Sequence, residues 1–293
     1  MASKIPATLV VGADSLIGSA LMPELLAAGW PVIGTTRRAE RAGSMVRLDL
    51  KDDVAHWESP AHVDVVIICA GVTALAECAD DPEGSGRVNI DGITALAQNF
   101  GARGSFVVHL STNQVFSGDN PLPGVDAAVS PITEYGRQKA EAEKRVLALK
   151  NRSAVLRMTK VLGKHNQLLD GWVSSLKNGE PITPFSDINF SPVPLGFVVS
   201  VLKRMAKAQQ PGVFHISGEK DVSYEYAARM AARVTGADAG LVRPCRSEEA
   251  STKPHPKHTT LDTAGLVSFF GKAPPPVDWT LNTAFTNPGA LAP

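Results

Sequence analysis

The stretch Ala7-Thr-Leu-Val-Val-Gly-Ala-Asp-Ser-Leu-Ile-Gly18 decides the fold of this 293-residue chain. Its first five residues are apolar or β-branched and predict a buried strand, and Leu16–Ala28 has the pattern of a helix. Runs of the first kind predict further strands at Pro31–Thr36, Met45–Leu48, Val63–Cys69, Ser105–Leu110, Ala154–Met158 and Val213–Ile216. Helical patterns lie between or after them at Pro82–Phe100, Ser130–Lys150, Phe197–Ala208, Ser223–Thr235 and Thr263–Phe270.

This alternation of strands and helices predicts an α/β fold with a doubly wound parallel sheet, the Rossmann arrangement. Residues 1–160 carry most of the alternation and are expected to form that domain. Proline and glycine become dense between Gly179 and Gly196, and the composition changes near Val161. Residues 161–293 are therefore expected to form a smaller C-terminal part that binds substrate and returns strands or helices to the first domain.

The loop after the first predicted strand has the spacing of a phosphate-binding turn. Gly12, Ser15 and Gly18 follow a G-x-x-G-x-x-G pattern in which Ser15 replaces the middle glycine. Such a loop places the pyrophosphate of a dinucleotide on a helix N-terminus. Leu16 and Ile17, the first helical residues, are expected to contact the cofactor together with these three. A plain turn with two glycines is the alternative.

The residues after the second and third predicted strands indicate which dinucleotide binds. Sites that prefer NAD usually carry an acidic residue after the second strand, for the ribose hydroxyls. Here Arg37 and Arg38 stand there instead, and two guanidinium groups suit a 2′-phosphate. The sequence favours NADP, with NAD as the second choice of cofactor and a solvated basic turn as the alternative. Asp49 and Leu50, after the third strand, are expected to face the adenine.

A tyrosine and a lysine lie one turn apart in the helix predicted at Ser130–Lys150, with Ser130 as its N-cap. The i, i+4 spacing places Tyr135 and Lys139 on one face. A nearby ammonium is expected to lower the pKa of the phenol, so that Tyr135 can exchange a proton with a substrate oxygen. The upstream strand ends near Thr112, which can bring a hydroxyl to the same oxygen.

These motifs resemble those of the extended short-chain dehydrogenases/reductases, and within them the dTDP-4-dehydrorhamnose reductase subgroup. Ser111-Thr-Asn-Gln-Val-Phe-Ser-Gly118 is similar to the S-T-D-Y-V-F-x-G segment of the subgroup. Pro131 to Lys139 is similar to its P-x-x-x-Y-G-x-x-K helix, and Cys69-Ala-Gly71 to its fourth-strand loop. Further similar stretches run through most of the chain, including Val155–Gly163 and Val213–Gly218.

The resemblance implies a catalytic set of Thr112, Tyr135 and Lys139. Tyr135 would protonate a carbonyl oxygen as hydride arrives from the nicotinamide, and Thr112 would hydrogen-bond that oxygen. Lys139 would tune Tyr135 and hold the nicotinamide ribose. The resemblance also assigns Cys69, Ala70 and Gly71 to the cofactor site. In the subgroup the substrate is a nucleotide-activated 4-keto sugar.

Departures from the family pattern keep other activities in view. Sugar-nucleotide dehydratases use an acid pair after the threonine, whereas this chain has Asn113 and Gln114, which are expected to contact substrate. An epimerase needs an extra acid/base pair, of which His165 could be one half. Trp172 is expected either to line a sugar pocket or to pack in the core. The altered stretch Ser186–Pro192 and the replacement at Ser15 keep open a dinucleotide-binding regulatory subunit without turnover.

Composition and charge exclude several classes of protein. The chain has 29 basic and 29 acidic residues and 44% hydrophobic residues, which argues against a disordered chain and a nucleic-acid binder. We expect no membrane span and no signal peptide. We also expect no metal site, because His255 and His258 lack further ligands at suitable spacing. Three sparse cysteines are typical of reduced thiols in the cytoplasm. By analogy with the family, a homodimer is the expected assembly.

Overall fold

The computed structural model describes residues 5–41, 45–164, 166–250 and 255–287. The chain forms two compact units, each built from several segments. The first unit consists of Met1–Phe116, Ala128–Arg157 and Val199–Phe214, and the second of Ser117–Ala127, Met158–Val198 and His215–Pro293. A single division at residue 160 does not describe these units. Residues 117–127 belong with the second unit, and residues 199–214 return to the first.

The first unit is built on a seven-stranded sheet in the order β10-β6-β5-β4-β1-β2-β3. Its strands are β1 (Thr8–Val11), β2 (Val32–Thr36), β3 (Val46–Arg47), β4 (Val65–Ile68), β5 (Phe106–Thr112), β6 (Ser153–Met158) and β10 (Gly212–Ile216). β1 pairs in parallel with both β2 and β4, β2 with β3, and β4 with β5. The strand order reverses at β1, so the carboxyl end of β1 is the topological switch point at which doubly wound sheets bind ligands. The predicted α/β fold is confirmed.

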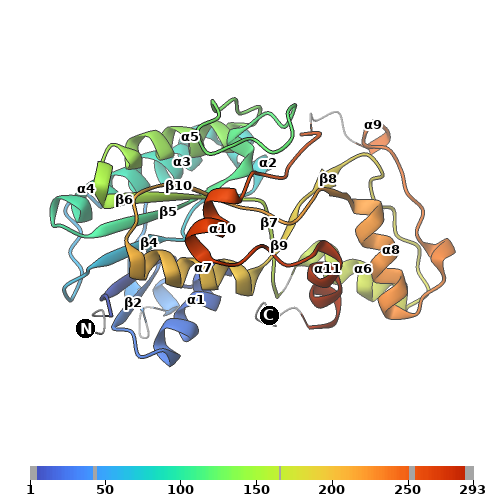
Figure 1. Ribbon diagram of the computed structural model, residues 1–293, viewed down its shortest axis with the longest axis horizontal. Coiled ribbons are helices and arrows are strands. Elements are labelled where there is room, and N and C mark those ends of the chain that lie inside the picture. The colour runs from blue at the N-terminus through green and yellow to red at the C-terminus, as the bar shows by residue number, and fades with distance from the viewer. Residues whose placement is uncertain (1–4, 42–44, 165, 251–254, 288–293) are drawn as a thin grey trace. The chain divides into compact units, whose positions relative to one another are not determined.

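Helices cover both faces of this sheet (Figure 1). One face carries α1 (Leu16–Ala27) and α7 (Leu195–Ala208), and the other carries α3 (Pro82–Gly86), α4 (Ile93–Ala102) and α5 (Glu134–Leu147). Further elements of this unit are α2 (Leu75–Asp80), η1 (Ala39–Arg41), η3 (Asn113–Val115) and η4 (Lys150–Arg152). The helix predicted at Pro82–Phe100 is α3 and α4 joined by η2 (Arg87–Gly92), a π-helical segment.

Burial explains why the strands of the first unit were recognisable. Every residue of β1, β4 and β5 is buried, as expected for parallel strands with helices on both faces. Leu9, Val66, Ile93 and Phe100 belong to one continuous apolar cluster between the sheet and its helices. This rigid core fixes the ends of β1, β2, β4 and β5, from which the candidate site residues extend.

The second unit has its own core. β7 (Lys160–Leu162) pairs in parallel with β9 (Pro192–Pro194), and β8 (Asn189–Phe190) pairs antiparallel with β11 (Val222–Ser223). Its helices are α6 (Gln167–Lys177), α8 (Tyr224–Thr235), η5 (Ala239–Leu241), α9 (Ser247–Ala250), α10 (Ala264–Phe270) and α11 (Val277–Thr286). Side chains of α6, α8 and α11 share one apolar cluster.

Candidate active site

The loop between β1 and α1 is shaped so that only glycine fits at two positions. Gly12 has φ +76°, and a Cβ there would lie 2.8 Å from the Cβ of Ala70. A Cβ on Gly18 would lie 2.2 Å from the carbonyl oxygen of Gly12. The loop therefore packs tightly against both α1 and the residues that follow β4. A tight turn at the first glycine and close helix–strand packing at the third are two of the features of a pyrophosphate-binding loop.

Ser15 acts as the N-cap of α1. Its hydroxyl accepts a hydrogen bond from the N–H of Gly18 at 3.1 Å, and its own N–H donates to the carbonyl of Gly12 at 3.0 Å. The Ser15 N–H is therefore occupied within the turn. The helix itself offers no acceptor to the N–H groups of Leu16 and Ile17, which remain suited to an anion at the positive end of the helix. The serine therefore caps the helix, and the N–H groups of Leu16 and Ile17 would be the ones to face a bound phosphate.

The residues after β2 and β3 lie where the sequence predicted them, with one addition. Arg37 and Arg38 are exposed directly after β2. The Nε atom of Arg38 lies 3.5 Å from a carboxylate oxygen of Asp14, a residue of the phosphate loop that sequence reasoning missed. Asp49 is half-buried and accepts a hydrogen bond from the N–H of Lys51 at 3.0 Å.

Residues of the η2 segment contact both Leu50 and the turn that follows β4. Leu50 is buried in the apolar core, and a Cβ on Gly92 would lie 2.1 Å from its carbonyl oxygen. Burial raises the pKa of the Cys69 thiol to about 12, so this residue stays a neutral thiol. The side-chain oxygen of Asn89 accepts from the N–H of Val72 at 2.8 Å, which fixes the turn after Gly71.

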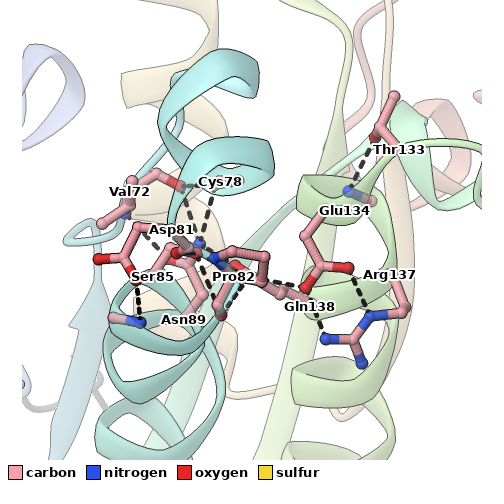
Figure 2. Close-up of polar contacts among 12 residues, drawn as sticks. Val72, Cys78, Asp81, Pro82, Ser85, Asn89, Thr133, Glu134, Arg137 and Gln138 are labelled. Atoms are coloured by element: carbon pink, nitrogen blue, oxygen red, sulfur yellow. Dashed lines mark hydrogen bonds and ion pairs between the residues drawn. The ribbon is translucent and has the colours of Figure 1, made fainter.

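A network of amide side chains connects this turn to α5 (Figure 2). The Nδ2 of Asn89 donates to the carbonyl of Val72 and to Oε1 of Gln138, both at 2.8 Å. The Nε2 of Gln138 donates to the hydroxyl of Ser85 at 2.8 Å and to Glu134 at 3.0 Å. The network thereby couples the turn beside the phosphate loop to the helix that carries Tyr135 and Lys139. Sequence reasoning missed Gln138, because its partners Asn89 and Ser85 are far away along the chain.

Tyr135 and Thr112 lie together at the end of β5. Strand β5 continues through Thr112, and Tyr135 lies in the first turn of α5, which begins at Glu134. Burial raises the pKa of the Tyr135 phenol above its ordinary value, the nearby Cys78 acts in the same direction, and a hydrogen bond with Thr112 opposes both. The prediction of a lowered Tyr135 pKa is therefore wrong. The phenol stays protonated at physiological pH, as a proton donor must be.

Lys139 is directed to the neighbouring strand. Its Nζ donates to the carbonyl of Leu110 at 2.6 Å and lies 3.1 Å from Nε2 of His109. Burial lowers the pKa of Lys139 to about 8, against the opposing effect of the Glu143 carboxylate. Burial and the same ammonium lower the pKa of His109 well below its ordinary value, so the imidazole is neutral. These two contacts direct the Lys139 amine to β5.

A buried ion pair holds the strand end against α5 and β6. Arg157 and Glu143 approach to 2.8 Å, and the hydroxyl of Ser111 donates to Glu143 at 2.5 Å. The guanidinium of Arg157 also stands 5.1 Å from the ring centre of Phe116. A buried charge pair with additional hydrogen bonds fixes geometry more than it adds stability. Here it fixes the strand residue that precedes Thr112.

The remaining predicted substrate residues have different surroundings. Asn113 and Gln114 form the short η3 turn after Thr112 and are half-buried. The side-chain oxygen of Gln114 accepts from the hydroxyl of Thr133 at 3.1 Å. Trp172 lies on α6 in the core of the second unit, with its ring edge-on to Tyr224 at 6.2 Å. The core-packing alternative describes this tryptophan.

The predictions about His165, a metal site and the cysteines have the following outcomes. His165 lies outside the residues that the structure describes. Within the described ranges, no group of three or more histidine, cysteine, aspartate or glutamate side chains converges as metal ligands would. The three cysteines are free thiols.

The sequence matches one family along almost its whole length. The profile of the family described as the RmlD substrate binding domain matches residues 7–287. The chain belongs to the RmlD family. A relative, the dTDP-4-dehydrorhamnose reductase of Mycolicibacterium smegmatis, is 30% identical over 262 residues, which cover 87% of this chain and 77% of the relative.

This RmlD family member is also similar to a second relative in sequence and to a solved structure. Methionine adenosyltransferase 2 subunit beta from Rattus norvegicus is 27% identical over 278 residues, which cover 88% of this chain and 80% of that protein. The crystal structure of dTDP-4-dehydrorhamnose reductase from Bacillus anthracis in complex with NADP has a TM-score of 0.85 at 20% identity. It covers 97% of this chain and 99% of that one, and at this identity it supports the fold. The sequence-based resemblance to the reductase subgroup is confirmed.

Proposed function

We propose that this chain is an NADPH-dependent reductase of a nucleotide-linked 4-keto sugar. The observation that carries the proposal is the pair of hydroxyls at the end of β5. Tyr135 is protonated and Thr112 lies close enough to affect its pKa, so both hydroxyls can bind one carbonyl oxygen. The glycine-lined cradle at Gly12 and Gly18 fits a dinucleotide pyrophosphate. The names of its curated relatives support the substrate class.

The chemistry follows from the protonation states of these residues. A bound NADPH supplies the hydride that converts the carbonyl carbon into an alcohol carbon. Thr112 and Tyr135 polarise the carbonyl oxygen, and the phenolic proton of Tyr135 forms the new O–H bond. Lys139, with a pKa of about 8, is mostly protonated at pH 7 and would hold the nicotinamide ribose, as the family resemblance implies. Asn113 and Gln114 offer no acid for eliminating water, so the proposed reaction ends at the alcohol.

Tyr135→Phe tests the proposal directly. We expect NADPH binding, followed by nicotinamide fluorescence, to stay within about twofold, while keto-sugar-dependent NADPH oxidation falls by about 10²–10⁴-fold. The matched control is Tyr226→Phe, which removes an exposed phenol bonded to Asp278 in the second unit. That control is expected to keep full turnover. Full activity in Tyr135→Phe, or loss of cofactor binding, would contradict the proposed role.

A regulatory subunit is the second candidate, and the match to methionine adenosyltransferase 2 subunit beta is the observation that favours it. It predicts NADPH binding without oxidation for every 4-keto sugar nucleotide, and a partner that co-purifies at fixed stoichiometry. An epimerase is distinguished by solvent deuterium that enters the sugar carbon beside the carbonyl.

Assembly and location belong to the same proposal. None of the helices in the described ranges has the length and apolar character needed to cross a membrane. The family resemblance favours a homodimer and the sparse free cysteines favour the cytoplasm. Light scattering after size-exclusion chromatography measures the first, and fractionation of cells with an antibody against the chain measures the second.

A further inference from the structure

An acidic side chain lies beside the basic pair that follows β2. Oδ2 of Asp14 accepts a hydrogen bond from the hydroxyl of Thr36 at 3.0 Å and lies 3.5 Å from Nε of Arg38. The N–H of Arg38 in turn donates to the Thr36 hydroxyl at 3.1 Å. The Asp14 side chain is 12% exposed and that of Arg38 is 49% exposed. The carboxylate is therefore fixed by its surroundings, whereas the guanidinium can turn toward a ligand.

The fold brings these residues together although they are far apart in the sequence. β1 and β2 are parallel neighbours, with Val10 opposite Gly34, so both strands end at the same edge of the sheet. The N–H of Ala13 donates to the carbonyl of Thr35 at 2.8 Å, which extends the pairing into the phosphate loop. No acidic residue follows β2 directly in the sequence. Asp14, which follows β1, places a carboxylate at the end of β2 in its stead.

This place has a defined chemical meaning in a dinucleotide site. An acid there accepts the ribose 2′-hydroxyl of NAD, and an arginine there binds the 2′-phosphate of NADP. A phosphate group carries between one and two negative charges near neutral pH, so a carboxylate close to it is repulsive. The two side chains therefore have opposite effects on the two cofactors.

We propose that Asp14 is a cofactor-selectivity residue, which accepts the 2′-hydroxyl of NAD(H) and competes with the 2′-phosphate of NADP(H) for Arg38. The inference rests on the proposed function, because it requires a dinucleotide in this loop. With NAD(H), Asp14 keeps its ion pair with Arg38 and gains the ribose hydroxyl. With NADP(H), Arg38 leaves Asp14 for the phosphate, beside Arg37. Both cofactors bind, and Asp14 makes the difference between their affinities smaller.

The test is a titration of the purified full chain with NADPH and with NADH, followed by nicotinamide fluorescence at one fixed ionic strength. For Asp14→Asn we expect tighter NADPH binding and weaker NADH binding, each by about three- to tenfold, because one charge and one acceptor are removed. For Arg38→Gln we expect NADPH binding to weaken by about tenfold or more while NADH binding changes little. Asp91→Asn is the matched control, since it breaks an aspartate–arginine pair with Arg145 elsewhere in the first unit. It should leave both dissociation constants unchanged.

Any other result would contradict the role of Asp14, the role of Arg38 or the proposed function. Equal weakening of both cofactors in Asp14→Asn assigns Asp14 a purely structural role in the loop, and unchanged constants assign it no role. Should that variant not fold, Arg38→Gln still decides, because equal weakening of NADH and NADPH there contradicts the exchange of partners. Failure of the unmodified chain to bind either cofactor overturns the proposed function, and the selectivity inference falls with it. Binding of both cofactors with an unchanged ratio in the variants overturns the selectivity inference alone.

Discussion

At the scale of single residues, Lys139 is the side chain whose surroundings most affect its chemistry. It is 5% exposed, and its amine contacts a neutral imidazole and a backbone carbonyl. The cost of removing an ammonium from water lowers its pKa to about 8, although the Glu143 carboxylate acts in the opposite direction. The lysine is thus poised to lose its proton just above physiological pH.

This depressed pKa makes a prediction about stability. Between pH 8 and pH 10.5 the unfolded chain holds more protons on this amine than the folded chain, so a rise in pH favours the folded state. Between pH 7.5 and pH 10 the unfolding free energy of the unmodified protein should rise, relative to that of Lys139→Met, by about 2–3 kcal/mol. Urea unfolding of both proteins at several pH values measures the difference.

The comparison between the two proteins removes the contributions of other groups. Tyr135 and Cys69, whose pKa values are raised, favour unfolding at high pH equally in both proteins. Lys144→Met, a change of an exposed lysine on the same helix, should show a difference that does not vary with pH. A flat difference for Lys139→Met as well would mean that this amine is not desolvated.

The sequence predicts which residues lie on one face of a helix. It predicts less well which residues of other elements their side chains contact. The i, i+4 spacing of Tyr135 and Lys139 is a local property of a helix and is readable from the chain. The contact of Lys139 with His109, and that of Asp14 with Arg38, join segments separated by more than twenty residues. Such contacts follow from strand order and register, which spacing along one element does not contain.

At the scale of elements, the start of α5 shows how tertiary contacts decide a helix boundary. The predicted cap at Ser130 is wrong, because Thr133 caps the helix. The N–H of Ser130 donates to the carbonyl of Val115, whereas the Thr133 hydroxyl accepts from the N–H of Gly136 at 3.0 Å. A Cβ on Gly136 would lie 2.1 Å from the carbonyl oxygen of Gln114, so this glycine lets α5 approach the η3 turn. The approach brings Tyr135 to Thr112.

Elements of the second unit were harder to predict for a physical reason. β7, β8, β9 and β11 are two or three residues long, too short for an alternating pattern to develop. Helices α6 and α11 were missed, although α6 has an N-cap in Asn166 and a buried face with Leu169 and Trp172. In the first unit, by contrast, buried strands of four to seven residues are visible as continuous apolar runs.

The amide network between η2 and α5 predicts a measurable contribution to stability. Gln138→Met keeps the volume of the side chain but removes the partner of Asn89 and of Ser85 in a buried place. Buried polar groups left without a partner lower the unfolding free energy by about 1–3 kcal/mol. Lys144→Met on the exposed side of α5 should change it by less than about 0.5 kcal/mol. Equal urea midpoints for the two variants would show that the network adds nothing.

At the scale of the whole molecule, the division into two discontinuous units separates the proposed cofactor residues from much of the rest of the chain. The phosphate loop, Arg38, Thr112 and Tyr135 all belong to the first unit. Helices α6 and α8 share a core that belongs to the second. Sequence reasoning predicted a division near residue 160 and a return of later segments, but not which segments return, because α7 and β10 carry no signal of their partner.

This separation predicts where a bound cofactor changes hydrogen exchange. A ligand at 100 times its dissociation constant stabilises the state that binds it by about 2.7 kcal/mol, which slows exchange by up to about 100-fold wherever opening requires release of the ligand. With NADPH alone, amides of Gly12–Gly18 and of the turn after β4 should gain this protection. Amides of α6 and α8 should exchange at an unchanged rate, and mass spectrometry of peptic peptides resolves both regions in one experiment. Equal slowing in both regions would contradict a cofactor site confined to the first unit. Unchanged exchange in the loop, in a sample whose fluorescence reports binding, would move the cofactor away from the β1–α1 turn.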